Sequence, residues 1–108
     1  MTWIDLESEA QLKLIQSRSF DHPVVIFKHS TRCGTSSMVK SRLDRSALPE
    51  GYEFYYLDLI RYRSVSNQVA ELFEVEHASP QVLLIRNGEC VYDESHMAIR
   101  MEELVEQQ

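Results

Sequence analysis

The sequence predicts a single α/β domain, residues 1–108, in which a mixed four-stranded sheet is flanked by helices. Its 108 residues and apolar fraction of 44% suit one domain with its own core. Two strand-like runs enclose a helical pattern, which favours a right-handed crossover between parallel strands. Asn87-Gly88 separates two further strand-like runs and is a strong signal for an antiparallel hairpin. The sheet is therefore expected to contain both parallel and antiparallel pairs.

The first half of the chain contains a helix, a strand and a second helix. Ser8-Glu9-Ala10-Gln11 has the form of a capping box and predicts a helix over about residues 9–18. The run Val24–Lys28 follows a proline and is apolar at consecutive positions, which is typical of a strand buried on both faces. Small polar residues fill Ser30–Ser37, and helical spacing then predicts a helix over roughly 34–46.

The second half begins after a turn at Pro49-Glu50-Gly51. The patterns then predict a strand ending at Asp58, a helix capped by Ser64 or Ser66, a strand over Val82–Ile85, a returning strand over Cys90–Tyr92 and a short helix over about Arg100–Glu106. All three prolines and all three glycines lie at these boundaries, so local and global signals agree.

Composition excludes several classes of protein. The net charge is −6, and the chain has no basic cluster beyond Arg61-Tyr62-Arg63, so we expect no nucleic-acid partner. The longest aliphatic or aromatic runs have four residues, whereas a membrane-spanning helix needs roughly 20, so no membrane partner is expected. The first ten residues show no secretory signal, which favours a reducing cytoplasm and two free thiols.

Cys33 is the candidate nucleophile because it follows a buried strand and lies at the start of a helix. The first turn of a helix presents free N–H groups and the positive end of the helix dipole, which favour a thiolate. Lowering a cysteine pKa from about 8.5 by two units takes about 2.7 kcal/mol of preferential stabilisation. The dipole, a hydrogen bond from Ser36 and the nearby side chains of His29 and Arg32 are the groups available to supply it.

Each cysteine also has a simpler interpretation. An isolated cysteine is commonly an inert buried side chain, although the small polar neighbours of Cys33 favour a reactive thiol. Cys90 stands beside the predicted hairpin, where a residue half-buried against Ile85 needs no chemical role. A disulfide requires Cα atoms within about 7 Å, and the hairpin end need not lie near the helix start. We therefore expect no resolving role for Cys90.

A metal site is the weaker alternative. The four histidines and Cys33 contain no close pair beyond His29-x-x-x-Cys33, and that spacing is not diagnostic between a strand and a helix. No metal is therefore expected.

The order of elements, with Ser79-Pro80 before one strand, resembles the thioredoxin fold over nearly the whole chain. Cys33-Gly34-Thr35-Ser36 takes the place of the redox Cys-x-x-Cys, with serine as its last residue. Within that fold, the strings Lys28–Ser36 and Val75–Gln81 resemble the YtxJ-type monothiol bacilliredoxins of the bacillithiol system. Two features depart from related proteins: Gly34 stands where family members commonly carry proline, and Phe27 where thioredoxins keep a buried aspartate.

The resemblance implies a monothiol disulfide oxidoreductase with Cys33 as its catalytic residue. No bound cofactor is expected, and bacillithiol is the implied co-substrate. The implied partners are client proteins that carry mixed disulfides with this low-molecular-weight thiol. The resemblance also implies that the peptide bond before Pro80 is cis and that Pro80 lies opposite Cys33.

The implied site residues form two sets. Those expected to stabilise the thiolate are Ser36, Gly34, Arg32 and His29, and those expected to bind substrate are Ser79, Pro80 and His77. The alternative function is a thioredoxin-fold module that binds a partner protein, with Cys33 not catalytic.

Overall fold

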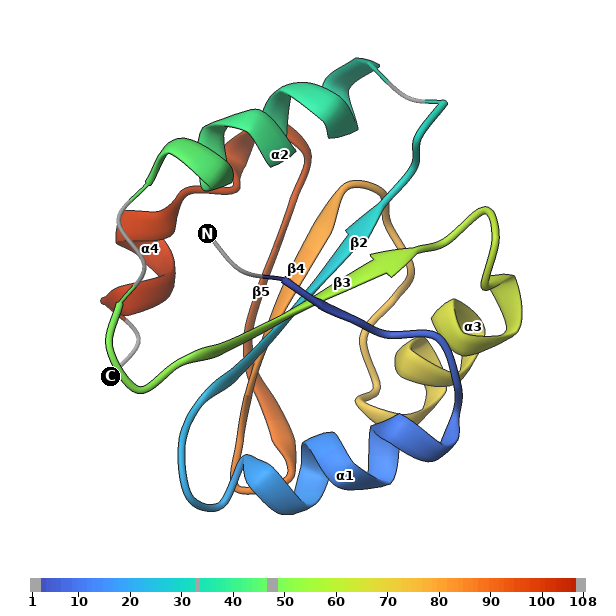
Figure 1. Ribbon diagram of the computed structural model, residues 1–108, viewed down its shortest axis with the longest axis vertical. Helices are drawn as coiled ribbons and strands as arrows, with labels where there is room; N and C mark the ends of the chain where they lie inside the picture. The colour runs from blue at the N-terminus through green and yellow to red at the C-terminus, as the bar shows by residue number, and fades with distance from the viewer. Residues whose placement is uncertain (1–2, 33, 47–48, 107–108) are drawn as a thin grey trace.

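A mixed five-stranded sheet with strand order β1-β3-β2-β4-β5 forms the centre of the protein (Figure 1). The computed structural model describes residues 3–32, 34–46 and 49–106. The strands are β1 (Ile4–Asp5), β2 (Val24–His29), β3 (Glu53–Asp58), β4 (Gln81–Arg86) and β5 (Glu89–Ser95). The predicted mixed sheet is confirmed, but the predicted number of four strands is wrong because β1 adds a fifth at the edge beside β3.

Four α-helices and one short 3₁₀ turn accompany the sheet in the described part of the chain. They are α1 (Ala10–Arg18), α2 (Gly34–Arg45), α3 (Arg63–Leu72), α4 (Met101–Val105) and a 3₁₀ turn over His96–Ala98. Figure 1 shows α1 and α3 on one face of the sheet and α2 and α4 on the other. No helix among the described ranges is long and apolar enough to cross a bilayer.

The central pairings follow the predicted topology. Strands β2 and β3 are parallel and are joined through α2, as the predicted crossover connection requires. Strand β4 pairs antiparallel with β2 on the other side, and the register places Lys28 opposite Gln81. All six residues of β2 are buried, so the prediction of a strand covered on both faces is confirmed.

The starts of two helices differ from the predicted capping. At α1, only half of the capping box forms: the Gln11 side chain accepts from the backbone N–H of Ser8 at 3.0 Å, and the N-cap has no side-chain hydrogen bond. The prediction that Ser64 or Ser66 caps the third helix is wrong. That helix begins at Arg63, and Asp58 satisfies the preceding turn by accepting from the N–H groups of residues 60 and 61 at 3.1 and 3.2 Å.

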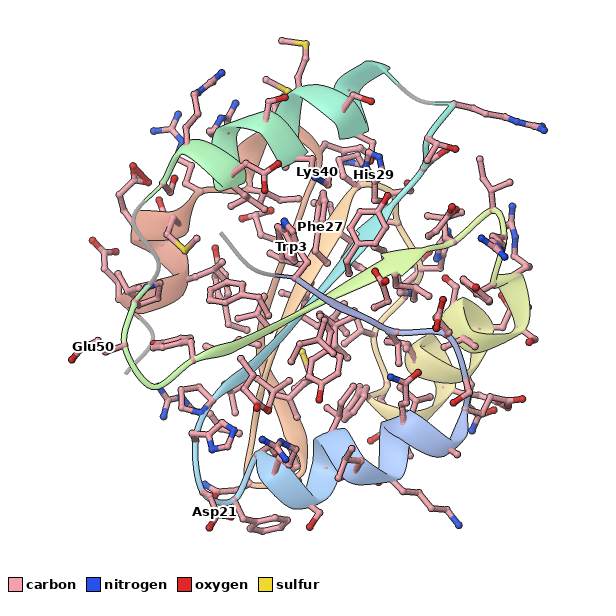
Figure 2. The ribbon with its side chains drawn as sticks, in the orientation of Figure 1. Trp3, Asp21, Phe27, His29, Lys40 and Glu50 are labelled. Carbon is pink, nitrogen blue, oxygen red and sulfur yellow. The ribbon has the colours of Figure 1, made fainter. Side chains whose placement is uncertain are left out.

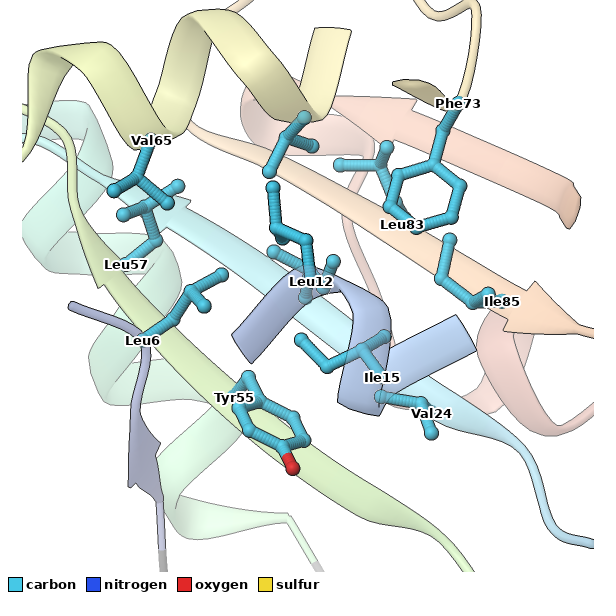
Figure 3. Close-up of a cluster of buried hydrophobic side chains, with 12 residues drawn as sticks. Leu6, Leu12, Ile15, Val24, Tyr55, Leu57, Val65, Phe73, Leu83 and Ile85 are labelled. Carbon is cyan, nitrogen blue, oxygen red and sulfur yellow. The ribbon is translucent and has the colours of Figure 1, made fainter. Parts of the chain in front are cut away.

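The sheet divides the hydrophobic core into two clusters. Figure 3 shows the cluster beneath α1 and α3, which consists of Leu6, Leu12, Ile15, Val24, Ile26, Tyr55, Leu57, Val65, Val69, Phe73, Leu83 and Ile85. The cluster beneath α2 and α4 consists of Val25, Phe27, Val39, Leu43, Tyr52, Phe54, Val82, Leu84, Ile99, Met101 and Leu104. Alternate residues of each central strand enter alternate clusters, because successive side chains of a strand point to opposite faces.

The hairpin predicted at Asn87-Gly88 is confirmed. Both residues have positive φ values, 52° and 79°, as a two-residue turn of this kind requires. Strand β5 then runs antiparallel to β4 and is longer than predicted. The Ser79–Pro80 peptide bond just before β4 is cis, as the resemblance implied.

Candidate functional site

The candidate site lies where β2 ends and α2 begins. Cys33, the expected nucleophile, lies outside the described residues, but the structure describes the residues on either side of it. Strand β2 ends at His29, and Arg32 is an exposed residue of the turn that follows. Gly34 is the exposed first residue of α2, and a Cβ atom there would have open space around it. The first turn of α2 contains no acidic residue, so no carboxylate offsets its positive end there.

A buried pair of side chains ties the end of β2 to the first turn of α2. Nδ1 of His29 lies 2.7 Å from Oγ of Ser36, and both side chains are almost fully buried. The same Ser36 oxygen accepts from the backbone N–H of Ser30 at 3.1 Å. The hydroxyl oxygen therefore has two neighbours within the site, and its single hydrogen can serve only one acceptor at a time.

His29 lies against a layer of aromatic rings beneath α2 (Figure 2). Its ring centroid is 5.7 Å from that of Phe27 and 5.4 Å from that of Tyr56. Burial lowers the pKa of His29, and the nearby cation of Lys40 lowers it further, while Asp58 acts in the opposite direction. His29 is therefore a neutral imidazole at pH 7, able to donate from one ring nitrogen and accept at the other.

The loop before β4 reaches the same edge of the sheet. Because Lys28 of β2 pairs with Gln81 of β4, Pro80 stands one position beyond that pair, beside the end of β2. Pro80 is buried, and its carbonyl accepts from the backbone N–H of His96 at 2.9 Å. The hydroxyl oxygen of Ser79 is buried and meets no hydrogen-bond partner among the described residues.

His77 lies on the other face of the sheet from His29 and Ser36. Its Nδ1 atom is 3.3 Å from Nζ of Lys28 and 3.4 Å from Oγ of Ser66 on α3. The strand alternates its faces, so Lys28 points towards α3 while His29 points towards α2. The structure thus brings His29 and Ser36 together and places His77, with Lys28 and Ser66, in a separate cluster on the opposite face of the sheet.

Sequence reasoning missed Lys28 and Ser66 as partners of His77. The fully buried Lys28 ammonium donates to the carbonyl oxygen of Ser66 at 3.2 Å. Burial lowers the pKa of Lys28 to about 8. One signal was available in the sequence. Lys28 is the last residue of an apolar run that is predicted to be buried on both faces, and lysine is almost never fully buried without a partner.

Cys90 lies at the other end of the sheet. It pairs with Ile85, which pairs with Val24 at the start of β2. Four residues of strand, about 13 Å, separate Val24 from Lys28 near the site. Burial raises the pKa of the Cys90 thiol to about 11, and Sγ donates to the carbonyl oxygen of Tyr92 at 3.3 Å. Both features support the expectation that Cys90 has no resolving role.

The described residues bring together no group of three or more histidine, cysteine, aspartate or glutamate side chains that could hold a metal ion. Of the histidines weighed as ligands, His29 and His77 face opposite sides of the sheet, as described above.

Comparison with known proteins identifies both family and fold. The family model of the monothiol bacilliredoxin BrxC matches residues 4–104. A solved structure described as a candidate oxidoreductase with a thioredoxin fold matches with a TM-score of 0.84 and 27% identity, over 96% of this chain and 91% of that chain. Thioredoxin from Fasciola hepatica matches with a TM-score of 0.76 and 18% identity, over 97% and 99% of the two chains. Thioredoxin O2 from Arabidopsis thaliana, in its oxidised state, matches with a TM-score of 0.74 and 21% identity, over 97% and 92%. The expected thioredoxin fold is confirmed.

Proposed function

The chain belongs to the monothiol bacilliredoxin family of thioredoxin-fold thiol–disulfide oxidoreductases, and on that premise we propose that Cys33 removes bacillithiol from mixed disulfides on client proteins. The observation that carries the proposal is the pairing of one candidate nucleophile with a serine at the position of the second redox cysteine. Ser36 cannot form a disulfide, and Cys90 is half-buried at the far end of the sheet. Regeneration therefore needs an external thiol, which a reducing cytoplasm supplies.

The exchange takes two steps. The Cys33 thiolate attacks the bacillithiol sulfur of the modified client, the client S–S bond breaks, and the client cysteine leaves as a thiolate that takes up a proton. A second bacillithiol, as its thiolate, then attacks the bacillithiol sulfur bound to Cys33. This step releases the Cys33 thiolate and the symmetric bacillithiol disulfide. The client cysteine is reduced and one free bacillithiol is oxidised, while the bacillithiol taken from the client passes from one disulfide to the other.

The His29–Ser36 pair supports a specific way of stabilising the Cys33 thiolate. If His29 donates from Nδ1, the Ser36 oxygen accepts from His29 and from the N–H of Ser30, and its hydroxyl hydrogen remains available to the thiolate. Hydrogen bonds that favour the charged form lower a cysteine pKa. In the proposed mechanism His29 orients the Ser36 hydroxyl. The backbone N–H groups at the start of α2, where Gly34 stands, and the exposed guanidinium of Arg32 add positive potential.

The loop around the cis-proline is the proposed binding site for the thiol-carrying segment. Ser79 offers its backbone N–H and C=O groups, and its buried hydroxyl lacks a partner among the described residues. Pro80 holds this loop beside the end of β2, and His77 lies in the same loop. Because one loop carries Ser79, Pro80 and His77, we propose that all three contact the docked substrate.

The test is the release of bacillithiol from a modified client by wild-type, Cys33→Ser and Cys90→Ser proteins. We expect Cys33→Ser to abolish release with the fold intact by circular dichroism, and Cys90→Ser to keep the wild-type rate. Full activity of Cys33→Ser would disprove the enzymatic role and leave the protein-binding module as the explanation. Loss of activity in Cys90→Ser would indicate a two-cysteine mechanism instead.

The identity of the small thiol has its own measurement. Whole-protein mass spectrometry after incubation with oxidised bacillithiol, glutathione or coenzyme A shows which thiol is transferred to the protein. We expect Cys33 to take up bacillithiol fastest. Equal uptake of all three would contradict a dedicated bacillithiol site.

A further inference from the structure

Lys28 is a buried charge that the proposed thiol exchange does not use. Its side chain is fully buried beneath α3, and its ammonium group contacts the Ser66 carbonyl at 3.2 Å and Nδ1 of His77 at 3.3 Å. It takes part in none of the salt bridges found among the described residues. Burying an ammonium group without a carboxylate partner costs free energy, and the hydrogen bonds to Ser66 and His77 offset part of that cost.

The chemistry of this contact fixes the protonation of His77. An ammonium group has three donors and no acceptor. Nδ1 of His77 can therefore bond to Lys28 only through its lone pair, and a proton at Nδ1 would point at a cation. The Ser66 hydroxyl, 3.4 Å from the same nitrogen, can also act as a donor to it. In the neutral ring, the single proton then belongs to Nε2.

We infer that Lys28 is a positioning residue, which holds His77 in its Nε2–H form so that the ring offers one N–H donor to an oxygen acceptor of the substrate docked at Ser79 and Pro80. The inference rests on the proposed function for its substrate, but the state of the His77 ring does not depend on any reaction. The acceptor is a carbonyl, hydroxyl or carboxylate oxygen, carried by the small thiol or by the client backbone.

The surroundings of His77 favour a neutral donor. Burial lowers the pKa of His77, and the cations of Lys28 on β2 and Arg63 on α3 lower it further. His77 is an exposed residue whose side chain is only partly buried, and its exposed part lines a surface groove. The charged residues that line the groove with it are the carboxylates Glu74, Glu76 and Asp93.

The first test reads the ring directly. In ¹⁵N NMR spectra of the whole protein at pH 7, we expect His77 to populate only the Nε2–H tautomer. In Lys28→Met, the Nδ1–H tautomer should appear, with the Ser66 hydroxyl as acceptor, and His77 should titrate at higher pH. His22, at the other end of the sheet, is the internal control. A wild-type ring with its proton on Nδ1, or a His77 titration unchanged in Lys28→Met, would overturn the inference.

The second test reads the donor. His77→Leu should raise KM about two- to ten-fold, the loss expected for one hydrogen bond, with kcat nearly unchanged. His77→Gln, whose amide N–H replaces the Nε2 donor, should restore much of the affinity. A KM rise with both a modified client and the symmetric bacillithiol disulfide assigns the acceptor to the small thiol, and a rise with the client alone assigns it to the client. An unchanged KM with both substrates would overturn the inference.

The two proposals fail separately. A protein in which Cys33 transfers no thiol but His77 keeps the Nε2–H form and responds to Lys28→Met disproves the proposed function and leaves the positioning role intact.

Discussion

Replacing Lys28 by methionine should stabilise the protein at neutral pH, and the gain should disappear in alkali. The side chain is fully buried, and methionine has a similar length without the charge. Burial lowers the pKa of Lys28 from 10.5 to about 8. At pH 7 the folded protein therefore holds a charged group in an environment that disfavours the charge. The unfolded chain carries the same charge in water at no such cost.

The pKa shift gives the magnitude. A difference of about 2.5 pH units corresponds to about 3 kcal/mol of stability lost by the wild type at pH 7. The variant also loses the hydrogen bonds to Ser66 and His77, which contribute about 1 kcal/mol each. The expected net gain at pH 7 is thus about 1 kcal/mol.

The pH dependence of stability separates the contribution of the Lys28 charge from that of its hydrogen bonds. Between pH 8 and pH 10.5 the unfolded chain binds the Lys28 proton while the folded protein releases it, so wild-type stability rises with pH in this window. Methionine does not titrate. The free energy of unfolding of Lys28→Met, relative to wild type, should therefore fall by about 2–3 kcal/mol between pH 7 and pH 10.

The assay is urea unfolding of three proteins at pH 7, 8.5 and 10. Lys13→Met is the matched control, because Lys13 is exposed on α1 and its replacement removes the same charge from the surface. Titrating groups other than His77, which contacts Lys28, are common to all three proteins and cancel in the differences. A stability difference between Lys28→Met and wild type that stays constant with pH, or that matches Lys13→Met, would refute the buried-charge reasoning.

Three further predictions concern the end of β2 and the two thiols. Iodoacetamide at pH 6 should label Cys33 far faster than Cys90, because burial raises the pKa of the Cys90 thiol to about 11. Peptide mass spectrometry measures both labelling rates, and faster labelling of Cys90 would contradict the assignment of the nucleophile. Ser36→Ala should lower the free energy of unfolding by about 1–3 kcal/mol, because it leaves the N–H of Ser30 and Nδ1 of His29 without their buried partner. The variant should also release bacillithiol more slowly. An unchanged stability in urea unfolding would contradict the role given to these two hydrogen bonds. Gly34→Ala should raise stability by about 0.4–1 kcal/mol, since a Cβ has open space there and alanine restricts the unfolded chain; a loss in thermal unfolding would contradict this.

The sequence predicted the central elements because their signals are local. Consecutive apolar residues in Val24–Lys28, the turn at Asn87-Gly88 and the helical spacing after Gly34 each specify an element without reference to the rest of the chain. The strand β1 was missed because Ile4 and Asp5 are two exposed residues with no periodic pattern. Their strand conformation depends on pairing with Tyr55 and Tyr56, about 50 residues away.

The site was predicted as a set of residues but not as an arrangement. The motif indicated Ser36 and His29, and the structure adds that they contact each other. His77 was expected near the cis-proline, and nothing local indicated that its ring would meet Lys28. That contact depends on which face of β2 carries each side chain and on the packing of α3 against that face, which brings in Ser66. Local signals do not contain such information.

The position of Trp3 gives the protein an intrinsic optical probe. Trp3 is the only tryptophan of the chain, and its indole N–H donates to Asp44 on α2 at 2.7 Å. Its ring packs against Phe27 at 5.6 Å between centroids, with the Lys40 ammonium 6.0 Å away (Figure 2). Fluorescence emission of the unlabelled protein therefore originates beside the helix that follows Cys33. Loosening of α2 shifts this emission towards that of indole in water, so events at the helix can be followed in stopped flow without a dye.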